Sequence, residues 1–279
     1  MEKHIPKRDR KIIERESIVK FNSEIELTQW ALDALSLWLF LDYDGTLADF
    51  APTPDQLHQN RKVIDLLHRL EQKQKFRMTV ISGRRLQDIR ILLPISGIFL
   101  CGTYGIELLT PTGETIHRVD YDEVRPALEI IKPKWTRLIS GRKGFFLEDK
   151  GWTLAIHARF ADDTESDEVL TSAHRVIDEE KLAKRFRVLG GYKFLEIVPL
   201  LGSKRETVIY LFQKFSLPGA KCVYIGDDDK DEEAFPVIHG HNGVAIKVWQ
   251  PSQSFSPTEA DFVFDSPRTT IHWLESLTR

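Results

Sequence analysis

Short apolar runs rich in β-branched and aromatic residues recur along this chain of 279 residues, separated by longer stretches whose apolar residues have helical spacing. This alternation is typical of a parallel sheet wrapped by helices. We expect helices over 61–74 and 203–215, the second opening with a capping-box pattern from Ser203 to Glu206. The expected core strands are 37–42, 76–81, 98–101, 222–225, 243–246 and 261–264. The sequence therefore predicts an α/β fold with a Rossmann-like parallel sheet core.

The middle of the chain departs from this alternation of strand-like and helix-like stretches. Helical spacing over 121–138 and 166–184 is mixed there with further strand-like runs, and core-type strands resume afterwards. These runs are 145–148, 152–159, 186–189 and 194–198. We therefore predict an inserted α+β domain. The predicted division is an N-terminal extension at 1–36, a core at 37–107 and 200–279, and the inserted domain at 108–199. Within the extension, the stretch 25–37 has the spacing of an amphipathic helix.

Composition narrows the range of partners. The formal net charge is -3 and both signs are mixed along the chain, which argues against the basic stripe of a nucleic-acid binder. The opening stretch 1–16 is highly charged, and the strongest apolar run, 37–41, is too short to span a bilayer. We therefore expect a cytoplasmic protein with no nucleic-acid or membrane partner. Cys101 and Cys222 each lie within an apolar run, which favours two buried thiols over a disulfide or a metal pair.

Two carboxylates, Asp42 and Asp44, stand where an expected strand ends, and Gly45 lets the chain turn away. Residues i and i+2 of an extended chain face the same way, and open α/β sheets bind ligands at the carboxyl ends of their strands. A second acidic run, 227–233, directly follows the expected strand 222–225 and lies at the same edge. Either run alone is equally consistent with a solvated helix start. Because both fall at strand ends, they favour a site for Mg²⁺, which prefers hard oxygen ligands.

Groups suited to phosphate occur at two further positions. Ser82, Gly83 and Arg84 follow another apolar strand and precede a helix-like stretch, which offers a hydroxyl and backbone N–H groups to an anion. Lys204 lies in the first turn of an expected helix, where a lysine opposes the helix dipole and so suggests a counter-charge for an anion. Taken alone, Ser82 would be an N-cap and Lys204 a surface lysine.

In chain order these pieces are Asp-Tyr-Asp-Gly-Thr-Leu from Asp42, Ser-Gly-Arg from Ser82, Gly-Ser-Lys ending at Lys204, and Gly-Asp-Asp-Asp-Lys-Asp-Glu from Gly226. Together they resemble the four motifs of the haloacid dehalogenase superfamily, in which a parallel-sheet core carries an inserted cap. The resemblance implies a Mg²⁺-dependent phosphatase. Asp42 would attack phosphorus, and Asp44 would protonate the leaving alcohol and then activate the water that hydrolyses the aspartyl-phosphate. The resemblance also implies that Ser82, Gly83 and Lys204 bind the phosphoryl group. It implies that the metal is bound by Asp42, Asp44, Asp227 and Asp228, with Asp231 completing the shell.

Three segments of the inserted domain, Glu148-Asp149-Lys150-Gly151, His157-Ala158-Arg159 and the stretch from Lys193 to Pro199, are similar to the cap of trehalose-6-phosphate phosphatases. The resemblance to this family runs from about 37 to 264. It implies hydrolysis of trehalose 6-phosphate, with a trehalose-phosphate synthase as a candidate partner in the same pathway. The implied sugar contacts are Glu148, Lys150, His157, Arg159, Lys193 and Glu196 from the cap, and Arg84 and Tyr104 from the core.

Three substrate-facing positions depart from the family pattern. Tyr104 stands where a histidine is common, Tyr192 where a basic residue is common, and Lys230 where a threonine is usual. These departures leave the phosphoryl-transfer residues intact but keep other substrates open, namely another sugar phosphate or a glycosyl-3-phosphoglycerate. A phosphomutase with the same core and a non-catalytic sugar-phosphate sensor are further alternatives. His157 is equally consistent with a structural histidine.

Overall fold

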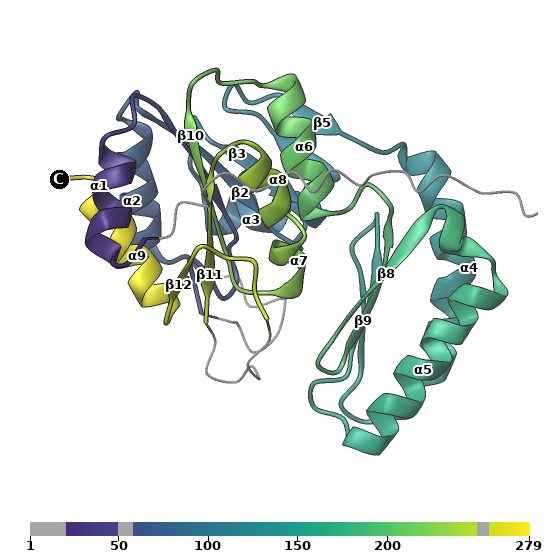
Figure 1. Ribbon diagram of the computed structural model, residues 1–279. Coiled ribbons are helices and arrows are strands. Elements are labelled where there is room, and N and C mark those ends of the chain that lie inside the picture. Colours follow the sequence, from purple (N-terminus) through teal and green to yellow (C-terminus); the bar gives the residue numbers. More distant parts are fainter. Residues whose placement is uncertain (1–20, 50–57, 250–256) are drawn as a thin grey trace, which may run out of the picture.

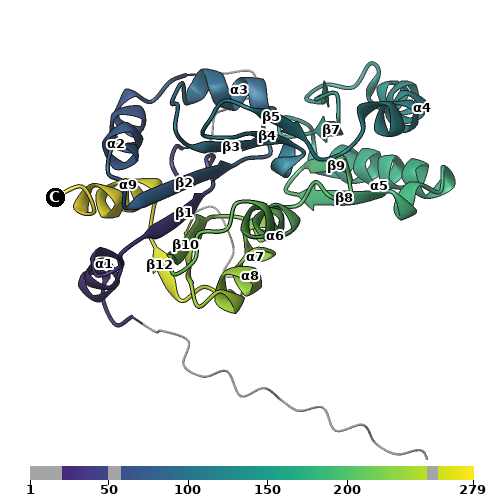
Figure 2. The ribbon, with the colours of Figure 1, turned by 90° about the horizontal axis from the view of Figure 1, so that it is seen from above.

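The computed structural model describes residues 21–49, 58–249 and 257–279, which form two sheets with their own helices (Figure 1, Figure 2). The larger sheet has the order β12-β11-β10-β1-β2-β3-β4-β5 and is parallel from β12 to β3. Its strands are β1 (Leu37–Leu41), β2 (Phe76–Ile81), β3 (Phe99–Gly102), β4 (Glu107–Leu109), β5 (Thr115–His117), β10 (Lys221–Gly226), β11 (Val244–Val248) and β12 (Phe262–Phe264). Each expected core strand overlaps one of these, so the predicted α/β fold with a parallel sheet core is confirmed.

Helices cover both faces of the larger sheet, which is why a central strand such as β1 is buried at all five positions. One face packs against α1 (Glu24–Leu32), α2 (Arg61–Glu71), α3 (Leu86–Leu92) and α9 (Pro267–Ser276). The other face packs against α6 (Lys204–Lys214) and α8 (Phe235–Gly240), beside the short α7 (Asp229–Glu232). Figure 1 shows α1, α2 and α9 on the opposite side of the sheet from α6 and α8. Within the described ranges, no helix is long and apolar enough to cross a membrane.

The two cysteines are buried free thiols, as predicted. Cys101 in β3 and Cys222 in β10 belong to the apolar cluster between the sheet and α6 and α8.

Helix α1 falls inside the stretch predicted as an N-terminal extension, yet it is part of the core. Ser23 caps it by accepting from the backbone N–H of Glu26 at 3.2 Å. Leu27 and Ala31, one helical turn apart, are fully buried in the same apolar cluster as α2 and α9. A helix is therefore present within the predicted stretch 25–37, but it ends at Leu32, and the core begins before residue 37. Residues 1–20 of the predicted extension lie outside the described residues.

The smaller sheet belongs to a second unit, here called the cap, which comprises residues 121–199. Its strands are β6 (Phe146–Asp149), β7 (Leu154–His157), β8 (Phe186–Gly191) and β9 (Phe194–Pro199), in the antiparallel order β6-β7-β9-β8. Helices α4 (Tyr121–Ile139) and α5 (Asp163–Glu179) cover one face, and a short 3-10 turn, η2 (Leu182–Lys184), follows α5. Trp135 is fully buried between them and donates its indole N–H to the Ala173 carbonyl at 3.1 Å. The cap thus has an apolar core of its own.

The first boundary of the predicted inserted domain, at 108, falls within the larger sheet. Leu108 lies in β4, which pairs antiparallel with β3, and β5 pairs with β4. Its side chain is buried in the cluster beneath α6. The hairpin β4–β5 therefore extends the core sheet, and the cap's own elements begin only at α4. The sequence did not reveal these two strands because β4 reads Glu-Leu-Leu and β5 reads Thr-Ile-His, whereas the equally short β12 was recognised as a wholly apolar run, Phe-Val-Phe.

A buried hydrogen-bond network joins the cap to the core. The Tyr104 hydroxyl, on the 3-10 turn η1 (Thr103–Gly105) after β3, donates to Glu196 Oε2 at 2.8 Å. Glu196 is fully buried, and its Oε1 accepts from Lys150 Nζ at 2.9 Å and from Thr153 Oγ1 at 2.5 Å. Lys150 also donates to the Gly83 carbonyl of the core at 3.1 Å. These contacts fix how the cap lies over the end of the core sheet.

A second contact between the units involves Arg187 of β8, whose guanidinium donates to both oxygens of Glu233 in the core. Glu233 also accepts from Ser203 Oγ at 3.1 Å. The cap is therefore tied to the loop after α7 and to the start of α6.

Replacement of Leu27 by alanine tests whether α1 belongs to the folded core. We expect Leu27→Ala to lower the free energy of unfolding by about 2–5 kcal/mol, because it leaves a cavity in a packed cluster. Ile25→Ala on the same helix is the matched control, since Ile25 is 81% exposed and its loss removes no packing. Urea denaturation followed by circular dichroism measures both. Equal effects of the two variants would show that α1 is not docked.

Tyr104→Phe tests the network between cap and core. Loss of a hydrogen bond to a buried charged group should lower the free energy of unfolding by about 1.5–3 kcal/mol. Tyr121→Phe is the control, because it removes the hydroxyl of a more exposed tyrosine on the cap. If both variants unfold at the same urea concentration as the unmodified protein, Tyr104 does not hold Glu196.

Candidate active site

The carboxyl ends of β1, β2 and β10 bring the sequence-predicted core residues together. The Asp42 N–H donates to the Ile225 carbonyl of β10 at 2.9 Å, and the Ser82 N–H donates to the Cys101 carbonyl of β3 at 2.9 Å. Sheet hydrogen bonds thus hold these two residues at the strand ends. Asp227 follows β10 directly, so residues distant in sequence meet at one edge of the sheet, where ligands bind in open α/β folds.

Asp42 is buried, and its two carboxylate oxygens differ in their surroundings. Oδ1 accepts from Lys204 Nζ at 2.6 Å. Oδ2 is buried and has no hydrogen-bond partner among the described residues. Burial raises the pKa of Asp42 to about 6, although Lys204 acts in the opposite direction. A buried anionic oxygen without a donor calls for a cation or another ligand.

Asp42, Asp227 and Asp231 form a buried cluster in which one carboxylate oxygen from each lies within 4.8 Å of the others. Burial, together with repulsion from Asp42 and Asp228, raises the pKa of Asp227 to about 10. Gly45 makes room for this cluster. Its φ is +85°, and a Cβ at that position would lie 2.4 Å from Asp227 Oδ2. The hard oxygen donors and the unpartnered oxygen of Asp42 fit a small divalent cation such as Mg²⁺.

Asp231 and Asp228 already use their oxygens within the protein. Asp231 Oδ1 accepts from Lys204 Nζ and from the Tyr224 hydroxyl, both at 2.7 Å, and Oδ2 accepts from the N–H groups of Asp227 and Asp228. Asp228 caps α7 and accepts from Lys230 Nζ at 2.9 Å. Both carboxylates therefore orient the loop that carries Asp227. Lys230, the departure from the family's threonine, pairs with Asp228, which Lys204 Nζ also approaches at 3.9 Å.

Lys204 is buried, with only 3% of its surface exposed, so it is not a surface lysine. Burial alone would lower its pKa, but the carboxylates of Asp231 and Asp42 raise it well above the ordinary value. Ser203 caps α6 by accepting from the Glu206 N–H at 3.4 Å. The reciprocal half of the predicted capping box is replaced, because the Ser203 N–H donates to the Leu201 carbonyl at 3.0 Å.

Asp44 and Ser82 lie beside the cluster and both contact Arg84. Asp44 forms a bidentate ion pair with Arg84, with Nε–Oδ2 at 2.7 Å and the second nitrogen to Oδ1 at 2.8 Å. Ser82 Oγ accepts from the Arg84 N–H at 3.1 Å. The N-cap of α3 is Arg85 rather than Ser82, so the N-cap alternative for Ser82 is wrong: the helix begins only at Leu86. Gly83 is required because a Cβ there would lie 2.8 Å from the Tyr104 ring.

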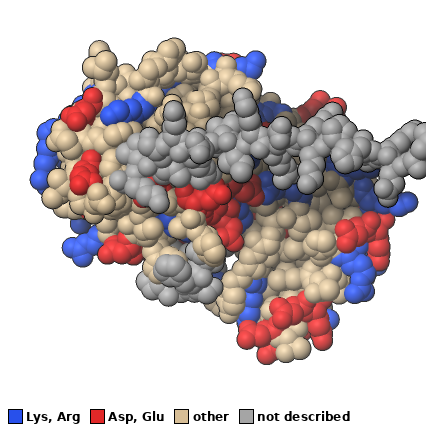
Figure 3. Space-filling view, viewed as in Figure 1, with Lys and Arg blue, Asp and Glu red and all other residues tan. Residues whose placement is uncertain are grey.

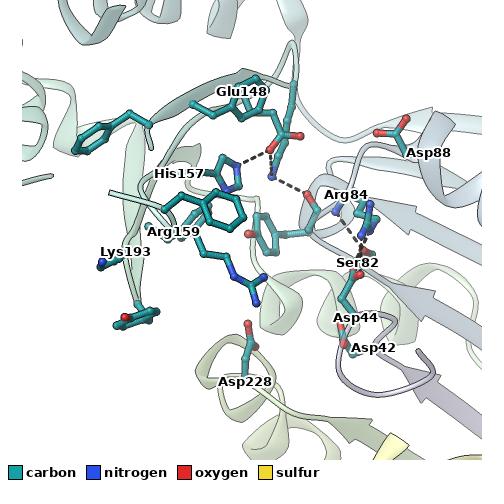
Figure 4. A pocket seen from close by; sticks show the side chains of 18 of the residues that line it. Asp42, Asp44, Ser82, Arg84, Asp88, Glu148, His157, Arg159, Lys193 and Asp228 are labelled. Atoms are coloured by element: carbon teal, nitrogen blue, oxygen red, sulfur yellow. Dashed lines mark hydrogen bonds and ion pairs between the residues drawn. The ribbon is translucent and has the colours of Figure 1, made fainter. Parts of the chain in front are cut away.

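A cavity of about 840 Å³ lies between the core and the cap and contains most of the sequence-predicted site (Figure 4). From the core it includes Asp42, Asp44, Ser82, Gly83, Arg84, Tyr104, Lys204 and Asp228. From the cap it includes Glu148, Lys150, His157, Arg159 and Lys193. Asp227, Asp231 and Glu196 do not line it. Acidic side chains gather near the junction of the two units on the face seen in Figure 3.

The cap residues that were predicted to bind the sugar differ in how accessible their side chains are to a ligand in the cavity. His157 Nε2 lies 2.8 Å from Glu148 Oε2, so these two side chains orient each other at the cavity wall. Arg159 points from the cap toward Asp228 (Figure 4). Lys193 Nζ instead donates to the Ala161 carbonyl at 2.5 Å and pairs with Asp163 at 2.6 Å. Glu196 is enclosed by Tyr104 and Lys150, so it holds side chains that line the cavity without lining the cavity itself.

Several cavity residues were not predicted as site residues. They are Asp88, Gly144, Phe145, Phe146, Phe160 and Phe194; Tyr192, expected as a substrate-facing departure from the family pattern, also lines the cavity. For two of them the sequence held a usable signal: Phe146 and Phe194 each stand two residues before a predicted contact, Glu148 and Glu196, in a strand. Asp88 lies in the first turn of α3, and only the position of that helix brings it to the cavity.

The chain is similar to known proteins along most of its length. A family model described as trehalose-phosphatase matches residues 40–268. The trehalose-phosphate phosphatase of Mycobacterium tuberculosis is 29% identical over 248 residues, an alignment that covers 86% of this chain and 61% of the relative. The chain thus spans about three fifths of the length of the curated mycobacterial relatives it matches.

Two solved structures share the fold. The Candida albicans trehalose-6-phosphate phosphatase C-terminal domain has a TM-score of 0.78 at 19% identity and covers 93% of this chain and 97% of that one. The Aspergillus fumigatus trehalose-6-phosphate phosphatase has a TM-score of 0.65 at 22% identity and covers 92% and 97%. The family model spans most of the chain, including all four motifs around Asp42, Ser82, Lys204 and Asp227, and the chain therefore belongs to the trehalose-phosphatase family.

Proposed function

We propose that this protein is a Mg²⁺-dependent phosphatase that hydrolyses trehalose 6-phosphate to trehalose and phosphate through an aspartyl-phosphate. The observation that carries the proposal is the state of Asp42: one oxygen is held by Lys204, and the other is buried, unpartnered and next to Asp227. A carboxylate with that arrangement is oriented for nucleophilic attack or for binding a cation. Family membership and the trehalose-phosphate phosphatase relatives support the same reaction and substrate.

The carboxylates of Asp42 and Asp227, with the backbone carbonyl of Asp44, would hold Mg²⁺. Asp228 and Asp231 would keep these ligands in place through the hydrogen bonds of the α7 capping box. A bound Mg²⁺ would offset the carboxylates and the negative charge of the phosphoryl oxygens. Lys204 would supply the second positive charge at the same group.

Asp44 would act as acid and then as base. Both of its oxygens accept from Arg84 in this structure, so protonation of the leaving alcohol requires the carboxyl group to turn away from that guanidinium. Arg84 then becomes available to a phosphate or sugar oxygen. The Ser82 hydroxyl and the Gly83 backbone lie beside this pair and would hold the phosphoryl group.

The cap would recognise the leaving alcohol of the phosphate ester. Glu148, His157 and Arg159 line the same cavity as Asp42 and Asp44, so the leaving alcohol of a bound sugar phosphate would face them. Carboxylate, imidazole and guanidinium groups together match a substrate with many hydroxyls. The buried network around Glu196 would keep the cap over the site and exclude water. In this proposal the enzyme serves trehalose biosynthesis in the cytoplasm, downstream of a synthase that supplies the phosphorylated disaccharide.

The reaction and the substrate are tested together by phosphate release from purified protein with Mg²⁺. The esters compared are trehalose 6-phosphate, sucrose 6-phosphate, glucose 6-phosphate, mannosyl-3-phosphoglycerate and glucosyl-3-phosphoglycerate. We expect preference for trehalose 6-phosphate, and we expect Asp42→Asn to lower kcat by more than about a thousandfold, as loss of a nucleophile does. Unchanged thermal stability of the variant is the control for folding.

The other outcomes separate the remaining alternatives. Preference for a different ester would keep the mechanism and reject the disaccharide. Release at an undiminished rate by Asp42→Asn would reject the aspartyl-phosphate. Binding of trehalose 6-phosphate without turnover by the unmodified protein would identify a sugar-phosphate sensor.

Metal binding has a test that does not depend on activity. After chelation, Mg²⁺ at about 100 times its Kd should stabilise the protein by about 2.7 kcal/mol, measured as a rise in the thermal midpoint. Asp227→Asn should lose this rise, while Asp229→Asn, an exposed neighbour, should keep it. Because Asp227 is repelled by the buried carboxylates, its replacement should not destabilise the metal-free fold. A full rise in Asp227→Asn would exclude Asp227 as a ligand.

A further inference from the structure

Five phenylalanine and tyrosine side chains of the cap line the cavity. Phe145 packs against the cap's apolar core, and we call the other four the aromatic wall: Phe146, Phe160, Tyr192 and Phe194. They come from β6, from the segment after β7, from the turn between β8 and β9, and from β9. Segments far apart in the cap sequence thus contribute rings to one surface. The function proposed above uses none of them.

Packing of the cap does not explain the aromatic wall. Phe146, Phe160 and Tyr192 are 52%, 68% and 83% exposed, and they do not belong to the cap's apolar core. Tyr121 is the other exposed aromatic residue in the described part of the chain, and it lies outside the cavity. Exposed phenylalanine is unfavourable in water, and exposed apolar side chains that gather at one cavity indicate a binding surface.

Polar groups are interleaved with these rings. The His157 ring lies between Phe146 and Phe194, with centroid distances of 5.9 and 5.2 Å, and its Nε2 meets Glu148. The wall therefore presents flat apolar faces beside hydrogen-bonding groups. A pyranose has the complementary surface, since its C–H groups form an apolar face and its hydroxyls project from the edge.

The position of the aromatic wall in the cavity indicates which sugar ring it would contact. Figure 4 shows Asp42 and Asp44 on the core side of the cavity and His157 and Lys193 on the opposite, cap side. His157 contacts two rings of the wall, and Lys193 Nζ lies 5.8 Å from the Tyr192 ring. A phosphate ester attacked by Asp42 places its phosphorylated ring next to the core. The part of a disaccharide beyond that ring extends toward the wall.

We propose that the aromatic wall is the subsite for the sugar ring that does not carry the phosphate, with Phe160 and Tyr192 stacking on its apolar face. This inference rests on the proposed function and assigns the ring contacts that set preference for a disaccharide over a monosaccharide. A nucleobase also stacks on aromatic rings. The sugar is favoured because Glu148 and Asp88, both lining the cavity, are carboxylates that accept from hydroxyls.

The test compares Phe160→Ala and Tyr192→Ala with the unmodified protein on trehalose 6-phosphate, glucose 6-phosphate and acetyl phosphate. Both side chains are exposed, so the variants should fold normally. We expect kcat/KM for trehalose 6-phosphate to fall about three- to tenfold for each ring, mainly through KM. Activity on glucose 6-phosphate and acetyl phosphate should be unchanged. Tyr192→Phe should retain the activity of the unmodified protein, and Ile130→Ala, an exposed apolar residue on α4 outside the cavity, is the matched control.

Several results would overturn the subsite. Equal losses on trehalose 6-phosphate and glucose 6-phosphate would place the wall at the phosphorylated ring or at cap closure. No loss on either would show that the wall contacts no sugar. With a nucleoside monophosphate as a fourth substrate, a preference of the unmodified protein for it that is lost in the two variants would assign the aromatic wall to a base.

A binding measurement separates this inference from the proposed function. Calorimetric titration of Asp42→Asn with trehalose 6-phosphate and glucose 6-phosphate gives the same comparison without turnover. Tighter binding of the disaccharide that disappears in Asp42→Asn combined with Phe160→Ala would support the subsite even if hydrolysis is not detected. Equal binding of the two esters would reject the subsite, while hydrolysis of acetyl phosphate by the unmodified protein would show that the phosphoryl chemistry still stands.

Discussion

One buried ammonium, that of Lys204, faces a cluster of buried carboxylates, and the arrangement of the site depends on this excess of negative charge. Lys204 donates to Asp42 and Asp231, while Asp227 lies in the same cluster. Burial of like charges is costly unless they are neutralised, so the fold must bring protons or a cation to this point. The sheet supplies the geometry, because Asp42 and Asp227 end neighbouring parallel strands, and α6 supplies the lysine. Gly45 completes it by leaving no side chain between them.

The cap is placed by a second buried charge that is neutralised within the protein. Glu196 has donors on both oxygens, from Tyr104 of the core and from Lys150 and Thr153 of the cap. The tyrosine that replaces the family's common histidine is therefore a structural link between the two units. Glu196 itself is fully buried and does not line the cavity. In the proposed function, sugar recognition would then fall to Glu148, His157 and Arg159 and to the exposed rings around them.

Much of the fold followed from patterns that are local in sequence, and the errors came where contacts are not local. The core strands were recognised because each is a buried apolar run, and the strand-end carboxylates followed from their spacing. The hairpin β4–β5 was missed because each strand is only three residues long and carries polar residues, unlike the equally short but wholly apolar β12. The link between Tyr104 and Glu196 spans 92 positions, so no local pattern reveals it. Ser82 was open to an N-cap assignment because the sequence did not show that α3 begins four residues later. The aromatic wall comes from separate segments, which only the folded cap brings together.

The two aspartates of the first motif show how one short sequence can contain groups with different chemistry. Asp42 is buried at the carboxyl end of the central strand β1, and one of its oxygens accepts from Lys204. Burial raises its pKa to about 6. Asp44, two residues on, lies in the turn at the cavity and pairs with Arg84 through both oxygens. Different environments are what divide two carboxylates into separate roles. The fixed one is suited to be the nucleophile, since attack requires a defined position. Asp44, at the cavity, is suited to give a proton to the leaving group and then to take one from the attacking water, once its ion pair with Arg84 opens.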